Sequence, residues 1–224
     1  MSEIPYSTIA VTGPDSFEFL QAQLTFDLNK LRDASAAKTV RSAWCNPKGR
    51  VICMPFVAVV DNGYTLTLPS DLVELVMQRL TMFRFRSKVE FEVRPGESSG
   101  DKSALEMLQA GIPEIELTQS EKFTPHMLNL DLLEIVSLDK GCYPGQEIIA
   151  RTHYRGASKR RCLRFESSAP VSVGDKVSDG QRDIGEVVNA IGTDMLAVVP
   201  LDKADATLTI DGQDISHIPL EYLG

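Results

Sequence analysis

The chain has 224 residues, of which 43% are hydrophobic, and a formal net charge of −8 at pH 7. This length fits one large domain or two small ones, and the apolar content is enough to build a core. The acidic balance argues against direct binding of nucleic acid by the whole surface. The longest apolar run is too short to cross a membrane, and the start of the chain lacks the pattern of a secretory signal.

The first elements predicted along the chain are a strand over 7–13 and a helix over 14–31. In that helix, Phe17 and four leucines recur every three or four residues and give one apolar stripe that should face a core. Two further strands follow, joined at the "NPKG" turn of 46–49, and the Asn-Gly dipeptide at 62–63 predicts a hairpin. This mixed order of strands and helices favours an α+β domain.

A second helix is predicted over 70–83, with Ser70 as its cap. The alternating pattern of 87–93 indicates a half-buried strand. A polar break at 94–102 follows, and then a short helix that should end at Gly111.

The pattern changes after Cys162, where short strand candidates are separated by Gly and Asp turns. Such spacing favours a small all-β barrel or sandwich. We therefore expect an α+β protein with two domains, which divide the chain into residues 1–160 and 161–224.

One stretch, "DKGCYPGQEIIARTHYRGASKRRC" at 139–162, differs from the rest of this acidic chain. A helix should begin near Pro144–Gly145, with Gln146 and Glu147 in its first turn, where acceptors are favoured. Residues 140–164 contain a single acid, Glu147, and seven basic residues: Lys140, Arg151, Arg155, Lys159, Arg160, Arg161 and Arg164. This local charge indicates either a solvated surface or a site for an anionic ligand or partner.

Along the predicted helix, Ile148, Ile149 and Thr152 suit a buried face, while Arg151 and Arg155, four residues apart, should share one side. Cys142 precedes the helix N-terminus and has several cations nearby, and both factors favour thiolate over thiol. An exposed Cys142 would be a nucleophile, a redox-sensitive thiol or a soft metal ligand. The alternative is a small buried residue without chemistry.

The other candidates give weaker signals. The four cysteines form no Cys-x-x-Cys pair, so free thiols in a reducing, cytoplasmic environment are expected. Trp44, the only tryptophan, is expected in the core, with a flat face for a ring-shaped ligand as the alternative. The three histidines, His126, His153 and His217, are scattered, and no metal site is predicted from them.

The 139–162 stretch resembles the signature of the YgfZ family, folate-binding proteins that support iron–sulfur enzymes. The hallmark Lys-Gly-Cys-Tyr/Phe-x-Gly-Gln-Glu is matched by Lys140, Gly141, Cys142, Tyr143, Gly145, Gln146 and Glu147. Further similarity lies in "TGPDSFEFLQAQLTFDL", "CNPKGR", "AGIPEI" and "FTPHMLNL", so the resemblance covers most of the chain. It implies a fold like the glycine-cleavage aminomethyltransferase, with a C-terminal β-barrel.

The chain departs from the family in three places. The segment between "SKVEFEV" and "AGIPEI" is short, so most of a second α/β lobe should be absent. Gln109 replaces the family's glutamate before "AG", and an amide has one acceptor oxygen fewer than a carboxylate for a pterin edge. The acidic pair of the aminomethyltransferase aligns with Cys53 and Met54. Weakened tetrahydrofolate binding and no aminomethyltransferase activity are expected.

The resemblance implies an accessory factor for iron–sulfur cluster assembly or repair, which supports tRNA-modifying enzymes. Cys142 would be the reactive thiol, and Lys140, Arg151 and Arg155 would attract an anion such as folate. Tyr143, Gln146, Glu147, Gln109 and Trp44 complete the candidate ligand-binding residues. Partners would be iron–sulfur proteins or assembly factors. The alternatives are a folate-dependent one-carbon transferase and a binding module with a structural Cys142.

Overall fold

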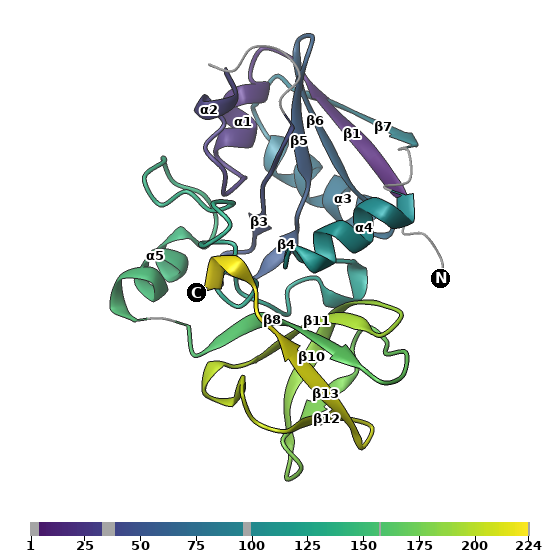
Figure 1. Ribbon diagram of the computed structural model, residues 1–224. Coiled ribbons are helices and arrows are strands. Elements are labelled where there is room, and N and C mark those ends of the chain that lie inside the picture. Colours follow the sequence, from purple (N-terminus) through teal and green to yellow (C-terminus); the bar gives the residue numbers. More distant parts are fainter. Residues whose placement is uncertain (1–4, 33–38, 96–99, 157, 224) are drawn as a thin grey trace.

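The computed structural model describes residues 5–32, 39–95, 100–156 and 158–223. Figure 1 shows an open sheet with helices in one half of the molecule and a β-barrel in the other. The sheet has the strand order β2-β5-β6-β1-β7. Its strands are β1 (Tyr6–Thr12), β2 (Thr39–Arg41), β5 (Phe56–Val60), β6 (Gly63–Pro69) and β7 (Glu90–Pro95).

Helices cover one face of this sheet. They are α1 (Ser16–Gln21), α2 (Asn29–Arg32) and α3 (Val73–Arg84), with a single 3-10 turn at Ser70–Leu72 before α3. Apolar residues of β1 and β6, such as Ile9 and Leu66, pack against Leu20 of α1 and Leu80 of α3. The expected apolar residues at 17–31 therefore do face a core.

The single helix expected over 14–31 is wrong, because the chain leaves the helix after α1 and makes a second short helix, α2. Tertiary contacts of the intervening segment explain the break. Thr25 N–H donates to Ala43 O at 2.8 Å, and its hydroxyl donates to Ile135 O at 3.0 Å. Leu24 also forms a β-bridge with Trp44. These partners lie far away in the sequence, so local periodicity does not reveal them.

The two strands expected around "NPKG" are divided into four. The outer pair, β2 and β5, belongs to the sheet, while β3 (Trp44–Cys45) and β4 (Val51–Cys53) form a small separate hairpin. The hairpin expected at 62–63 is confirmed, since Val60 pairs with Gly63 at the end of β5 and β6. The capping role expected for Ser70 is wrong, because its hydroxyl contacts that of Ser7 at 2.8 Å.

The strand expected over 87–93 lies slightly later, as β7, and is mostly exposed. The helix before Gly111 is α4 (Gly100–Gln109), which begins inside the expected polar break. Residues 96–99 of that break lie outside the described residues. No helix in the described ranges has both the length and the apolarity that crossing a membrane requires.

The C-terminal region, from Arg160 onward, is a closed barrel with the strand order β10-β11-β8-β13-β12-β9, as the short strand candidates indicate. One short 3-10 turn, Leu117–Gln119, precedes the barrel, and two more, Leu201–Lys203 and Glu221–Leu223, lie within or after it. The barrel strands are β8 (Arg160–Ser167), β9 (Lys176–Ser178), β10 (Asp183–Ile191), β11 (Asp194–Pro200), β12 (Leu208–Ile210) and β13 (Gln213–Ile218).

The barrel shares a core with the rest of the chain. Cys45 and Val51 of the β3–β4 hairpin belong to the same buried cluster as Cys162 of β8 and Val198 of β11. Asn189 adds a polar link, since its side chain accepts from Glu114 N at 2.9 Å and donates to Glu114 O at 3.0 Å. The two halves are therefore packed through apolar and hydrogen-bonded contacts.

Candidate functional site

Residues 140–145, which precede α5 (Gln146–Arg155) and are called the signature loop, are held by the β3–β4 hairpin. The side chain of Asn46 accepts hydrogen bonds from Lys48 N at 2.9 Å and Arg50 N at 3.0 Å, which shapes the hairpin turn. Gly145 lies directly against it: an added Cβ would be 2.6 Å from Asn46 O and 2.7 Å from Gly49 Cα. Gly145 also has φ of +81°, a conformation that favours glycine. The helix start expected at Pro144–Gly145 is thus confirmed, and its glycine is required by close backbone approach.

Lys140 anchors the other end of the loop. Its ammonium donates to three carbonyl oxygens, those of Gln21 at 2.7 Å, Leu24 at 2.6 Å and Phe26 at 3.1 Å. The residue is 8% exposed, and burial lowers its pKa from 10.5 to about 8. Its hydrogen bonds therefore hold the segment after α1, and desolvation of the ammonium opposes them. The ammonium is buried and does not face outward with the α5 arginines, so the expected anion-binding surface that includes Lys140 is wrong.

Tyr143 and Gln146 complete the internal hydrogen bonds of the loop. The Tyr143 hydroxyl donates to Ser137 O at 3.2 Å, and its ring lies 5.4 Å from the Lys140 ammonium. Burial raises the pKa of Tyr143 above its usual value of 10.0. The side-chain amide of Gln146 donates to Lys140 O at 3.2 Å. Both side chains thus position the loop from within.

Cys142 is the exposed thiol of this loop, while the other three cysteines are buried. Cys53 and Cys162 are completely enclosed, and burial raises the pKa of each to about 12. Burial likewise raises the pKa of Cys45. The signature loop therefore presents one accessible sulfur, held between the anchored Lys140 and the start of α5.

The outer face of α5 carries Glu147, Arg151 and Arg155, all of them exposed. Ile149 is buried as expected, whereas Ile148 is 44% exposed, so the expected burial of both isoleucines is wrong for Ile148.

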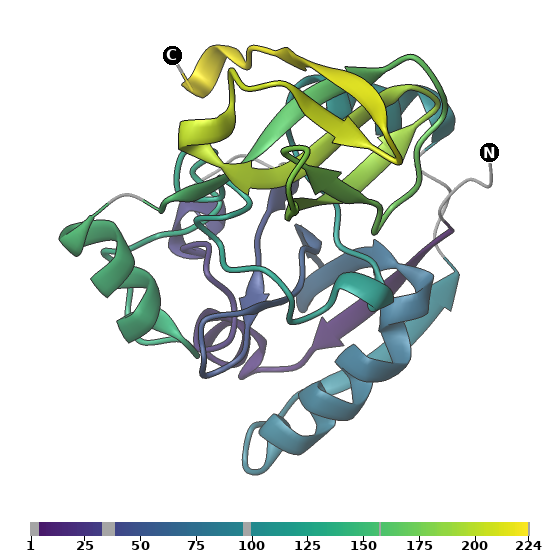
Figure 2. The same ribbon diagram turned by 90° about the horizontal axis from the view of Figure 1, so that it is seen from below.

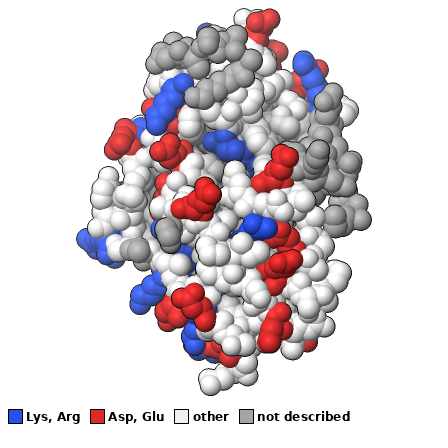
Figure 3. All heavy atoms as spheres, in the orientation of Figure 1, with Lys and Arg blue, Asp and Glu red and all other residues white. Residues whose placement is uncertain are grey.

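On the molecular face drawn in Figure 3, acidic and basic side chains are interspersed without one continuous basic surface. Figure 2 shows that α3 and α5 lie on opposite sides of the molecule.

Trp44 and Gln109 have no hydrogen bond to the loop of Cys142 among the described residues, and Trp44 is buried. Trp44 is 1% exposed and packs edge-on against Phe83, which confirms its expected place in the core. Gln109 is exposed at the end of α4 and donates to Asp194 at 3.4 Å, and Asp194 is paired with Arg164. Cys53 and Met54, at the positions of the expected acidic pair, are both buried.

An open cleft of about 370 Å³ lies where the segment after α1 meets the loop of 112–135. Arg41 on its wall is bound to Glu114 through bonds of 2.9 and 3.1 Å, and Tyr6 donates to the same carboxylate at 2.6 Å. The sequence did not single out Arg41 and Glu114, which are far apart along the chain. The lining residues are Phe26, Lys30, Val40, Arg41, Ile112, Leu133, Glu134 and Ile135.

Comparison with known proteins identifies relatives over most of the chain. An uncharacterised protein of Haemophilus influenzae is 28% identical over 235 aligned positions, with 84% of this chain and 83% of the relative covered. The tRNA-modifying protein YgfZ of Klebsiella pneumoniae is 26% identical over 274 positions, which cover 92% of this chain and 82% of the relative. Because 274 positions exceed the 224 residues of this chain, the relative has segments that this chain lacks.

A tRNA-modifying protein YgfZ of Escherichia coli is 35% identical over 157 positions, or 68% of this chain and 47% of the relative. Residues 159–222 match the C-terminal β-barrel domain of CAF17. In fold, the chain is similar to the glycine cleavage system aminomethyltransferase T from Bartonella henselae, with a TM-score of 0.74 at 14% identity. That similarity covers 97% of this chain and 84% of the other. The chain is therefore a homologue of proteins named tRNA-modifying protein YgfZ, and it has an aminomethyltransferase-like fold.

Proposed function

We propose that this protein is a cytoplasmic, folate-binding-type accessory factor that supports the assembly or repair of iron–sulfur clusters and so assists enzymes that modify tRNA. The observation that carries the proposal is the accessibility of one thiol, Cys142, among four cysteines. Internal hydrogen bonds of Lys140, Tyr143 and Gln146 hold the loop that presents it. These hydrogen bonds support the proposal that the signature residues serve to present Cys142 at the surface.

An exposed cysteine can attack a substrate, undergo oxidation or bind iron. One cysteine does not hold a cluster alone, since such sites take four protein ligands. The partners of Cys142 would therefore be iron–sulfur proteins or assembly factors that contribute the remaining ligands. The exposed Arg151 and Arg155 would attract an anionic small molecule or an acidic partner surface to the same helix.

Folate is the small-molecule ligand proposed for the family fold, and the cleft beside Arg41 and Lys30 is its candidate location here. A one-carbon transferase of the aminomethyl type is not favoured by any contact around Cys53 and Met54. Both side chains are buried, and neither can stabilise a cationic reacting centre as a carboxylate does.

The Cys142→Ser variant tests the proposal. Because Cys142 is exposed, we expect its melting temperature to stay within about 1–2 °C of the parent. The same variant should fail to restore iron–sulfur enzyme activity in cells that lack the protein. The two readouts are a thermal melt of the purified protein and an assay of tRNA methylthiolation in the complemented cells.

Cys53→Ala is the matched control, because it removes a buried thiol. This control should lower stability modestly and still complement. Normal complementation by a folded Cys142→Ser protein would remove the support for a reactive thiol. Unfolding of that variant would instead assign a structural role to Cys142.

A further inference from the structure

Two histidines and an aspartate that are separated in sequence meet where α5 approaches the loop of 124–131. His126 and Asp131 belong to this loop, and His153 lies in the last turn of α5. One ligand atom from each of the three side chains lies within 4.8 Å of those of the other two. These residues are too far apart along the chain for a ligand spacing to be recognised, so no metal site is predicted from the sequence.

His126 supplies the most informative atom of the cluster. The residue is 2% exposed, and its Nε2 has no hydrogen-bond partner among the described residues. A buried polar atom without a partner costs free energy, so a native site of this kind requires an explanation. The unprotonated nitrogen of an imidazole offers a lone pair to a metal ion, so a ligand at Nε2 would supply the missing partner.

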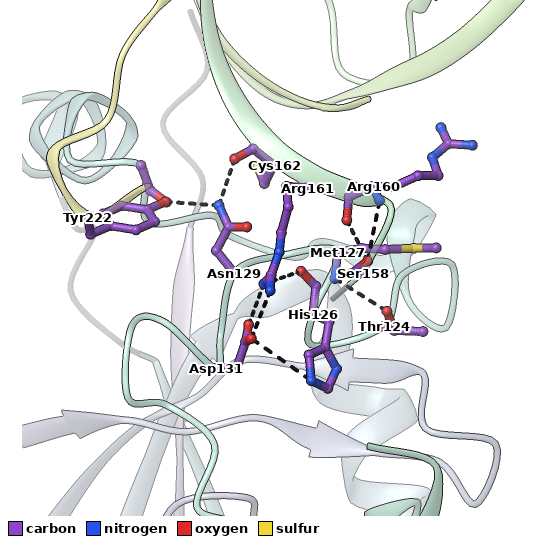
Figure 4. Close-up of polar contacts among 11 residues, drawn as sticks. Thr124, His126, Met127, Asn129, Asp131, Ser158, Arg160, Arg161, Cys162 and Tyr222 are labelled. Carbon is purple, nitrogen blue, oxygen red and sulfur yellow. Dashed lines mark hydrogen bonds and ion pairs between the residues drawn. The ribbon is translucent and has the colours of Figure 1, made fainter. Parts of the chain in front are cut away.

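Asp131 is fixed next to this nitrogen by Arg161, as Figure 4 shows. The guanidinium donates to Asp131 Oδ1 at 2.5 Å and to Oδ2 at 3.0 Å, and also to His126 O at 2.9 Å. His126 Nε2 is 3.9 Å from Asp131 Oδ2, which is too far for a hydrogen bond. Ligands of a tetrahedral ion with bonds of about 2.0–2.2 Å lie roughly 3.4 Å apart, so a small inward movement completes this edge.

His153 can move its ring nitrogen closer to the other two ligand atoms, because its side chain is exposed. Its ring centroid lies 6.2 Å from that of His126. A change of side-chain rotamer moves its nitrogen without disturbing the core. We infer that His126, Asp131 and His153 form a binding site for one divalent transition-metal ion of the Zn²⁺ type. Three protein ligands with an open fourth position are typical of zinc sites that also bind water or substrate.

Arg161 determines the charge balance of this site. It already neutralises Asp131, so a bound divalent ion retains positive charge, and an anionic group suits the open position. Binding also links the end of α5 to the loop of 124–131. The metal site is independent of the function proposed for Cys142, which lies before the opposite end of α5.

Isothermal titration of tag-free protein with ZnCl₂ tests the inference. The Cys142→Ser background is used, because an exposed thiol could itself bind zinc. We expect one Zn²⁺ per chain, and visible absorption of a Co²⁺-substituted sample characteristic of low coordination number. His153→Ala should weaken binding by at least about tenfold, since even the loss of an outer-shell partner costs about 10–100-fold.

The control is His217→Ala, which removes the histidine of the barrel that makes a tilted ring contact with Phe165 outside the cluster. This control should bind zinc like the parent, and a His126→Gln variant that remains folded should lose binding like His153→Ala. Absence of zinc binding, or binding that His153→Ala leaves unchanged, would overturn the site.

Discussion

At the scale of single residues, two glycines of the signature have opposite structural demands. Gly145 has a φ of +81° and touches the backbone of the β3–β4 hairpin, whereas an added Cβ at Gly141 would meet nothing within 4 Å. We predict that Gly145→Ala lowers the free energy of unfolding by about 2–4 kcal/mol, through backbone strain and a clash with Asn46 O. Urea denaturation measures the change.

Gly141→Ala is the matched control and should change the unfolding free energy by less than about 0.5 kcal/mol. It alters the neighbour of Cys142 without altering the packing of the loop. Equal stability of the two alanine variants would show that the contact between Gly145 and the hairpin is unimportant.

At the scale of elements, Lys140 links the signature loop to the segment between α1 and α2. We predict that Lys140→Met costs about 2–4 kcal/mol of stability, because three carbonyl oxygens lose their donor in a buried place. Lys159→Met, at an exposed lysine next to β8, should cost less than about 0.5 kcal/mol. Chemical denaturation at pH 7 compares the two.

The pH dependence provides a second measurement for Lys140. Its pKa falls from 10.5 to about 8 on folding, so the unfolded chain holds this proton more tightly between these pH values. The contribution of Lys140 to the unfolding free energy therefore rises with pH from about 8 to 10.5. Lys140→Met should lack this rise relative to the parent. A stable variant with weakened anion binding would instead place Lys140 in the ligand site.

At the scale of the whole molecule, the shortened chain should be a poor folate binder. The cleft of about 370 Å³ is at the lower end of the range for small-molecule sites, and its Arg41 is already paired with Glu114. We predict a dissociation constant for tetrahydrofolate well above about 1 µM. A constant of about 1 µM corresponds to a binding free energy of about −8 kcal/mol, so binding should be weaker than that. Isothermal titration measures it under anaerobic conditions.

The YgfZ protein of Klebsiella pneumoniae, which has the segments that this chain lacks, is the comparison for that titration. Tighter binding by the relative would show that the additional segments contribute to the folate site. Micromolar or tighter binding by this chain would contradict the prediction and show that the additional segments of the relative are dispensable.

Features that depend on short-range patterns could be predicted before the fold was known. The Asn-Gly hairpin, the start of α5, the burial of the leucines after Phe17 and the strand-rich C-terminal region follow from turn chemistry and periodicity. The signature around Cys142 also predicted the similarity to YgfZ proteins, because seven positions match within eight residues.

Features that depend on partners distant in the sequence became visible in the folded chain alone. Thr25 is not helical because it forms hydrogen bonds with Ala43 and Ile135. The ammonium of Lys140 donates to carbonyl groups more than a hundred residues earlier in the chain. His126 and His153 likewise meet only when α5 folds against the loop of 124–131. Hydrogen bonds and side-chain clusters across such separations leave no local period or spacing, so the sequence could name these residues without showing what they contact.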